Sequence, residues 1–271
     1  MMAARTNDFL EILNSSGYPL QSKIEEVVSS LGKSSPWSVL LSEYSWANST
    51  RGKEGYVDIV LSHHNVSRLV VESKRLDPAK WVFIVPKEAS NGVSRFRLAW
   101  SHGFFVGWDD LNVLPKSYEA RFCSGFEKQR FTLESIASTL VEAVNFLSVE
   151  EGLHQMKDRP NHYVYVPTIV TTAKLFVCPL DHDHVSLETG KLIENPECVE
   201  VPYIRFRKTL TTEENDDVKG DIETISILRE RSIMVINSAC MPEFLSQFHW
   251  EADPERGLPW NRQRSFTIER D

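Results

Sequence analysis

The sequence Gly55-Tyr-Val-Asp-Ile-Val-Leu61, followed closely by Arg68-Leu-Val-Val-Glu-Ser-Lys-Arg75, decides the fold that we expect for this chain. Both stretches are short and apolar, and polar turn residues separate them, so they predict two consecutive strands of one sheet. Asp58 lies in the first strand, and Glu72 and Lys74 lie in the second. Because side chains alternate between the faces of a strand, Glu72 and Lys74 are expected to point the same way.

Three charged side chains in two apolar strands indicate a chemical site, because buried charges are rare unless they act together. Mg²⁺ prefers oxygen ligands and is typically held by one or two carboxylates, which Asp58 and Glu72 would supply. A bound cation lowers the pKa of a water molecule and neutralises charge on a phosphate. Lys74 would orient or deprotonate that water, or stabilise the transition state. These residues therefore predict phosphodiester hydrolysis with Mg²⁺ or Mn²⁺.

The competing interpretation makes Asp58 a charge at a strand end, and Glu72 and Lys74 a solvated pair on an edge strand. Surface ion pairs of that kind are common and contribute little free energy. The run Leu69-Val-Val71 is typical of a central strand, which favours the site.

Asp58, a gap of thirteen residues and then Glu72-Ser73-Lys74 resemble the motif of the PD-(D/E)XK nuclease superfamily, although Val57 replaces the proline. The resemblance covers roughly residues 17–180. It implies a restriction-endonuclease-like α/β fold, with a mixed central sheet flanked by helices, and a Mg-dependent endonuclease acting on DNA. The alternative is a catalytically silent module of the same fold that binds nucleic acid or a partner protein.

The superfamily often completes its metal site with a glutamate on the first core helix, expected here over Leu20–Leu31. Glu25 lies nearer the edge of the apolar stripe of this helix than Glu26, which points further toward solvent. We therefore favour Glu25 as a further catalytic residue, with Gln21 as its neighbour one turn earlier. The choice among Glu25, Glu26 and the Gln21 position stays open.

The remaining elements follow from apolar periodicity. We expect one domain over residues 1–240, with a β-rich insertion at about 86–130 and a C-terminal extension over 241–271. The elements expected around the two central strands are helices over Asn7–Leu13, Thr132–Leu147 and Pro242–Phe248, and strands over Ser38–Ser45, Trp81–Val85, Tyr163–Val170, Lys174–Cys178 and Ser232–Asn237.

The segment 86–130 interleaves aromatic and basic residues, a combination that can contact nucleic acid by stacking and by phosphate binding. Arg95 and Arg97 in this segment, and Arg75 beside the motif, are the candidate nucleic-acid contacts. A hairpin packed on the core, or an oligomer contact, is the interpretation that we favour for the segment itself.

Two further motifs, Asp181-His-Asp-His184 and the pair His63-His64, could bind a transition metal, but both fit polar turns better. The acidic stretch 211–221 predicts a loop.

Composition sets the remaining expectations. The net charge of −8 argues against nonspecific coating of nucleic acid and raises the expectation of a protein partner or a homodimer. No apolar run is long enough for a membrane span, the N-terminus lacks a signal core, and the four cysteines are scattered. A cytoplasmic protein with reduced thiols and DNA as its partner is expected.

Overall fold

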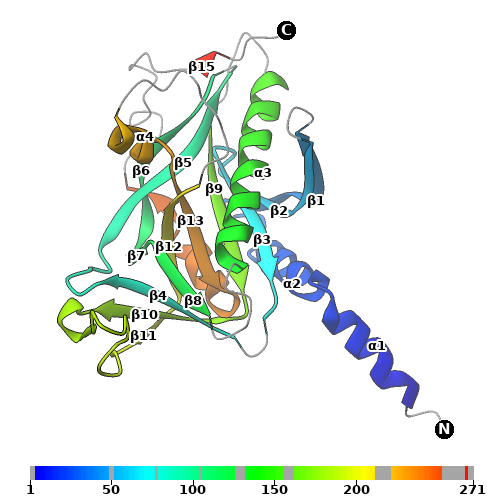
Figure 1. Ribbon diagram of the computed structural model, residues 1–271. Helices are drawn as coiled ribbons and strands as arrows, with labels where there is room; N and C mark the ends of the chain where they lie inside the picture. The colour runs from blue at the N-terminus through cyan, green and yellow to red at the C-terminus, as the bar shows by residue number, and fades with distance from the viewer. Residues whose placement is uncertain are drawn as a thin grey trace.

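A mixed β-sheet organises the computed structural model, which describes residues 4–48, 52–76, 79–103, 105–125, 132–154, 162–210, 221–251 and 266–267. Within these residues the sheet has 11 strands. Its main path runs, in spatial order, through β1 (Trp37–Asn48), β2 (Lys53–His63), β3 (Ser67–Lys74), β9 (His162–Thr171), β13 (Glu230–Asn237), β12 (Tyr203–Thr209) and β7 (Glu119–Ala120). The expected mixed α/β class, with a central sheet flanked by helices, is confirmed (Figure 1).

Strand directions follow from the connections. Strands β1, β2 and β3 are consecutive and antiparallel, whereas β3 and β9 are parallel. The crossover from β3 to β9 contains α3 (Thr132–His154), as a parallel connection requires. The turn between β2 and β3 places His64 and Asn65 at φ values of 50° and 58°. Positive φ values at two successive residues fit the hairpin turn expected here.

The segment 86–130 widens this sheet. Its long hairpin consists of β5 (Val93–His102) and β6 (Phe105–Ser117), and β5 pairs with β9. The expected hairpin is therefore present, as part of the main sheet. The short strands β14 (His249–Trp250) and β15 (Phe266–Thr267) pair with β6. A second sheet of four strands consists of β11 (Val199–Val201), β10 (Lys174–Leu180), β4 (Lys80–Pro86) and β8 (Phe122–Gly125).

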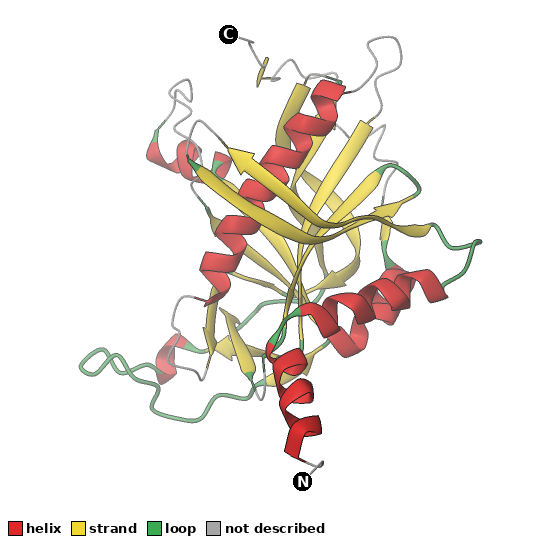
Figure 2. Ribbon diagram, turned by 90° about the vertical axis from the view of Figure 1, so that its right-hand side faces the viewer, coloured by secondary structure: helices red, strands yellow, loops and turns green. Residues whose placement is uncertain are grey.

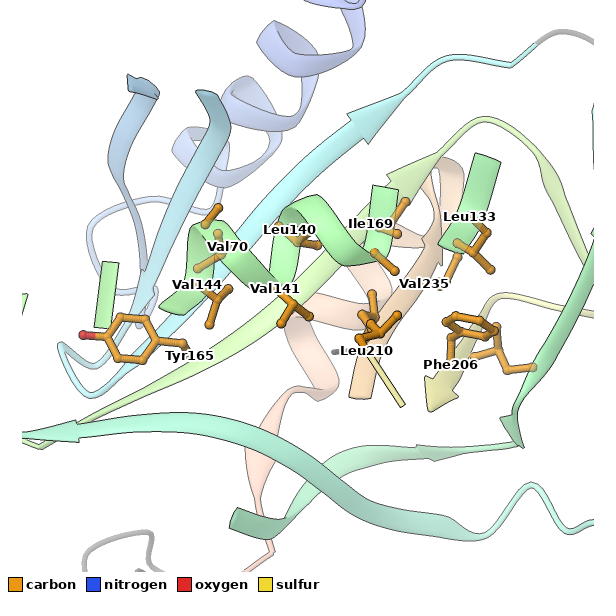
Figure 3. Close-up of a cluster of buried hydrophobic side chains, with 14 of the residues drawn as sticks. Val70, Leu133, Leu140, Val141, Val144, Tyr165, Ile169, Phe206, Leu210 and Val235 are labelled. Atoms are coloured by element: carbon orange, nitrogen blue, oxygen red, sulfur yellow. The ribbon is translucent and has the colours of Figure 1, made fainter. Parts of the chain in front are cut away.

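Helices cover both faces of the main sheet (Figure 2). On one face α3 packs against Val70 and Ile169 in a large apolar cluster (Figure 3). On the other face Leu69 and Val71 contact the cluster that includes side chains of two more helices. These are α2 (Tyr18–Ser30) and α5 (Met241–Gln247). Neighbouring β3 residues thus enter opposite clusters, which is why this strand reads as a continuous apolar run.

Helix α1 (Ala4–Ser15) projects from the body, and Phe9, Leu10, Ile12 and Leu13 on it are exposed (Figure 1). Strand β12 and helix α4 (Ile222–Leu228) were not among the elements expected from the sequence. Of the expected acidic loop, residues 211–220 lie outside the described residues, and Asp221 caps α4. No helix in the described part of the chain is long and apolar enough to cross a membrane.

His63, at the end of β2, makes stability depend on pH. It is buried, and its ring centroid lies 4.6 Å from that of Trp37 and 5.2 Å from that of Phe248. Burial lowers the pKa of His63 to about 4, with the nearby His64 and His249 adding to the shift. Between about pH 6.5 and pH 4 the unfolded chain therefore binds more protons here than the folded chain, so stability falls as pH falls.

We expect the free energy of unfolding to drop by up to about 3 kcal/mol over this window through His63 alone. Urea unfolding at pH 7 and pH 4.5 measures the drop. His63→Phe should reduce it, whereas His182→Gln, at an exposed position, should leave it as in the wild type. An equal pH dependence in His63→Phe and the wild type would contradict the assignment.

Candidate active site

Asp58, Glu72 and Lys74 meet where β2 and β3 run side by side. The pairing of β2 with β3 ends at Ile59 opposite Val71. One position further along both strands, Asp58 lies beside Glu72. On its other edge β3 aligns with β9, Lys74 lying opposite Thr171. Strand β3 is therefore a central strand, as expected. Its charged residues are paired with β9 on one edge and lie just past the last β2 register pair on the other.

The carboxylate of Asp58 is fixed from the neighbouring strand. Its Oδ2 accepts hydrogen bonds from the backbone N and from the Oγ of Ser73, both at 2.7 Å. From α2, Gln21 Nε2 donates to the Asp58 backbone oxygen at 3.1 Å, and Gln21 is only 4 % exposed. Within the described residues no hydrogen bond reaches Asp58 Oδ1, which leaves this oxygen available to a ligand.

Glu72 and Lys74 form an ion pair, with 2.6 Å between Lys74 Nζ and Glu72 Oε1. Their side chains are 21 % and 37 % exposed, so the pair is partly open to solvent. Burial raises the pKa of Glu72, and the negative charge of Asp58 raises it further, while Lys74 opposes both effects. Two carboxylates that repel each other while partly open to solvent form a place where added positive charge is favourable.

Hydrogen bonds join the chain after Lys74 to the turn that follows β9. Thr172 N donates to Lys74 O at 3.2 Å. Thr172 Oγ1 accepts from Leu76 N at 2.8 Å and donates to Leu76 O at 2.7 Å. These bonds hold the end of β3 in place.

Helix α2 brings Gln21 to the site. Glu25 is half-buried one turn further along, and no hydrogen bond or ion pair joins it to Asp58 within the described residues. Glu26 is exposed and pairs with Lys23 at 2.6 Å. Gln21 is therefore the side chain of α2 that contacts Asp58 within the described residues.

Ser73 was missed as a site residue. The available signal was its place between Glu72 and Lys74, on a strand adjacent to Asp58. A small hydroxyl side chain there donates to the neighbouring carboxylate together with its own backbone N–H.

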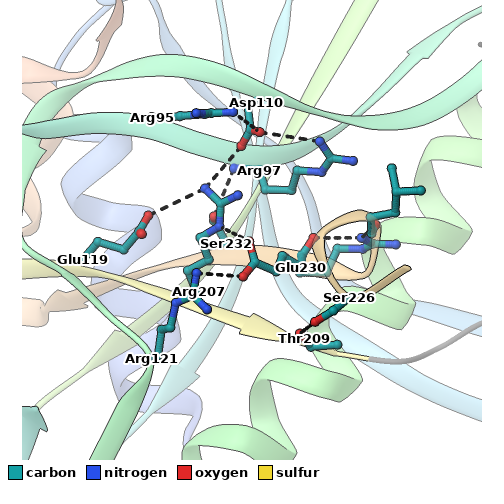
Figure 4. A network of polar contacts seen from close by, with 12 residues as sticks. Arg95, Arg97, Asp110, Glu119, Arg121, Arg207, Thr209, Ser226, Glu230 and Ser232 are labelled. Atoms are coloured by element: carbon teal, nitrogen blue, oxygen red, sulfur yellow. Dashed lines mark hydrogen bonds and ion pairs between the residues drawn. The ribbon is translucent and has the colours of Figure 1, made fainter. Parts of the chain in front are cut away.

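The three candidate nucleic-acid contacts lie on two different parts of the structure. Arg75 is exposed directly beside Lys74. Arg95 and Arg97 lie on β5, where both pair with Asp110 of β6, at 2.8 Å and 3.6 Å (Figure 4). The side chain of Arg97 is only 11 % exposed. A mostly buried guanidinium paired with a carboxylate offers little surface to a phosphate, so this geometry does not favour Arg97 as a nucleic-acid contact.

Of the two histidine motifs, Asp181–His184 lies at the turn after β10 and His64 lies in the turn after β2, whereas His63 is the last residue of β2 and is buried. Asp181 caps the short 3-10 helix η1 (His182–His184) by accepting from Asp183 N at 3.1 Å, and it pairs with Lys87. Within the described residues there is no group of three or more His, Cys, Asp or Glu side chains that could hold a metal ion. The acidic pair Asp58 and Glu72 is smaller than such a group.

Comparisons with known proteins give no relative: no family model, no curated protein and no solved structure matches this chain.

Proposed function

We propose that this chain is a metal-dependent phosphodiesterase that cleaves nucleic acid, with DNA as the expected substrate and the restriction-endonuclease-like fold as its scaffold. The observation that carries the proposal is the acidic pair Asp58 and Glu72, with Lys74 bonded to Glu72, on adjacent buried strands. The order of elements supports it: α2 and the antiparallel strands β1 to β3 are followed, after the intervening strands β4 to β8, by α3 and the parallel strand β9, which is the order that the resemblance implies with a segment inserted before the helix.

The residues present fit a hard divalent cation. Asp58 Oδ1 and Glu72 Oε2 are the oxygens that Ser73 and Lys74 leave available, and Mg²⁺ commonly uses only one or two carboxylates and keeps several waters. The raised pKa of Glu72 supports the assignment, because the repulsion from Asp58 that contributes to it would be relieved by a cation. Bound there, the cation would supply a more acidic water and charge neutralisation at the scissile phosphate.

The protein groups then have separate roles. Ser73 and Gln21 position Asp58, one at its carboxylate and the other at its backbone. Lys74, which is partly exposed, can orient a water molecule or donate to a phosphate oxygen as negative charge develops. Exposed Arg75 is the basic residue nearest in sequence for contacting the nucleic-acid backbone.

The second candidate is a binding module of the same fold without chemistry. One observation favours it: Gln21, a neutral residue, is the helix side chain that contacts Asp58, so the described site has two carboxylates and not three. Such a module would bind nucleic acid or a partner protein and release no cleaved product.

Metal binding tests the proposed function. Calorimetric titration of the folded wild type with Mn²⁺ should show one site, and Glu72→Gln should weaken its affinity by at least about tenfold, since even residues behind the ligands contribute 10–100-fold. Glu188→Gln, at an exposed loop position, is the matched control and should bind as the wild type does.

Cleavage of linear and plasmid DNA by the same proteins then separates the two candidates. Cleavage by the wild type that requires Mg²⁺ or Mn²⁺ and stops with a chelator supports the nuclease. Absence of metal binding in the wild type would overturn it. Metal binding without cleavage would favour the binding module.

A further inference from the structure

Cys178 and Cys198 lie opposite each other at the β10–β11 edge of the small sheet. The antiparallel register pairs Phe176 with Glu200 and Val177 with Val199, so the next position joins Cys178 and Cys198. The side chain of Cys198 lies close enough to raise the pKa of the Cys178 thiol. Residues opposite each other in antiparallel strands have Cα atoms about 4.5–5.5 Å apart. A disulfide spans about 4.4–6.8 Å, so a bridge fits here without moving the backbone far.

The two thiols differ in access to solvent. Cys198 is exposed, whereas Cys178 is 4 % exposed. Burial raises the pKa of Cys178 to about 11, and the neighbouring Cys198 side chain adds to the shift. Near neutral pH the buried Cys178 is therefore a protonated thiol, and Cys198 is the sulfur that an oxidant in solution meets first.

We propose that Cys178 and Cys198 form a redox-active pair, which hydrogen peroxide converts into a disulfide. The Cys198 thiolate attacks one peroxide oxygen, the O–O bond breaks, and the leaving hydroxide takes a proton to become water. Cys198 is then a sulfenic acid. Cys178 loses its proton and attacks the Cys198 sulfur, the S–O bond breaks, and a second water leaves. The two sulfurs together lose two electrons, which reduce one peroxide to two waters.

The bridge would close the long loop between β10 and β11, residues 181–198. This loop leaves the small sheet after Leu180, contains η1 and is largely exposed. Cross-linking its two ends restricts the unfolded chain more than the folded one, so the oxidised protein should be the more stable form. The pair acts independently of Asp58 and Glu72, which lie in the other sheet.

Peptide mapping tests the proposal directly. The folded full-length protein is treated with hydrogen peroxide, alkylated and digested with trypsin without reductant. Trypsin cuts after Lys174, Lys191 and Arg205, which places Cys178 in peptide 175–191 and Cys198 in peptide 192–205. We expect these two peptides to be joined by a disulfide that dithiothreitol releases. The oxidised protein should also unfold at a temperature about 5 °C higher.

Matched variants decide the outcome. Cys123→Ser, which changes a half-buried thiol on β8, should still give the linked peptides, whereas Cys198→Ser should not and should keep the unfolding temperature of the reduced protein. The proposal is overturned if the wild type keeps both thiols free. It is also overturned if Cys198 is oxidised to a sulfinic acid, or is linked to a cysteine other than Cys178.

Discussion

Lys74→Met should reduce the rate of DNA cleavage by about 10²–10⁴-fold, the range that a positioned proton-transferring or charge-stabilising group supplies. Methionine keeps most of the length of the side chain and removes the ammonium group that contacts Glu72 Oε1 at 2.6 Å. Because Lys74 also holds down the pKa of Glu72, the variant should leave Glu72 harder to ionise. Steady-state cleavage of a linear duplex at saturating Mg²⁺ measures the effect.

The control for Lys74→Met is Lys191→Met, which removes an exposed ammonium from the loop after β10 and should leave cleavage unchanged. Mn²⁺ affinity, measured alongside, should change less than the rate does, because in this proposal Lys74 is not a ligand. A rate within twofold of the wild type in Lys74→Met would remove Lys74 from the chemistry.

Arg205→Met should lower the free energy of unfolding by about 3 kcal/mol or more, the cost of leaving several buried acceptors without donors. Arg205 is fully buried on β12. Its guanidinium donates to Ser117 Oγ at 2.6 Å and to the backbone oxygens of Val113 and Pro115 at 2.6 Å and 2.8 Å. It also lies over the ring of Phe96, 4.8 Å from the centroid. Methionine fills part of this space and satisfies none of the three acceptors.

Urea unfolding followed by circular dichroism measures the Arg205 effect. Arg95→Met is the matched control, because Arg95 is exposed and its pair with Asp110 is a surface ion pair worth about 1 kcal/mol or less. Arg205→Lys, which retains a charge but not the planar fork, should fall between the two. Equal losses in Arg205→Met and Arg95→Met would show that the buried contacts of Arg205 do not stabilise the fold.

Local patterns were sufficient for the elements that surround the site. The apolar run Leu69-Val-Val71 predicted a central strand, and in the structure Leu69 and Val71 enter one apolar cluster while Val70 enters the other. The helical spacing of apolar residues also predicted the helix that begins at Thr132. In the structure this helix continues past Leu147 to His154. Burial on both sides of the sheet leaves a signal in the sequence itself, and it was this signal that the prediction used.

Long-range pairing left weaker signals. Strand β12 contains Arg205 and Arg207 among its buried residues, so its sequence does not read as an apolar run. Arg207 is buried with two partners: Glu230 on the neighbouring strand β13 pairs with it at 2.7 Å, and Asp110 on β6, distant in sequence, at 3.3 Å (Figure 4). Charges satisfied by such partners cannot be distinguished in a single sequence from charges exposed to water.

The same limit applied within the candidate site. The spacing of Asp58, Glu72 and Lys74 was enough to predict that they meet, since strand pairing fixes residues on adjacent strands. The approach of α2 was not fixed by any such register. Which residue of this helix faces Asp58 depends on its packing against the sheet, and that packing brings Gln21 to Asp58.

Anomalous diffraction from a crystal soaked in Mn²⁺ tests the central claim most directly. The proposed site predicts an anomalous peak between the Asp58 and Glu72 carboxylates, with oxygens of both residues as ligands. Crystals of Glu72→Gln soaked in the same way should lose the peak or show it strongly weakened. A wild-type crystal with saturating Mn²⁺ and no peak at this position would contradict the metal-dependent nuclease.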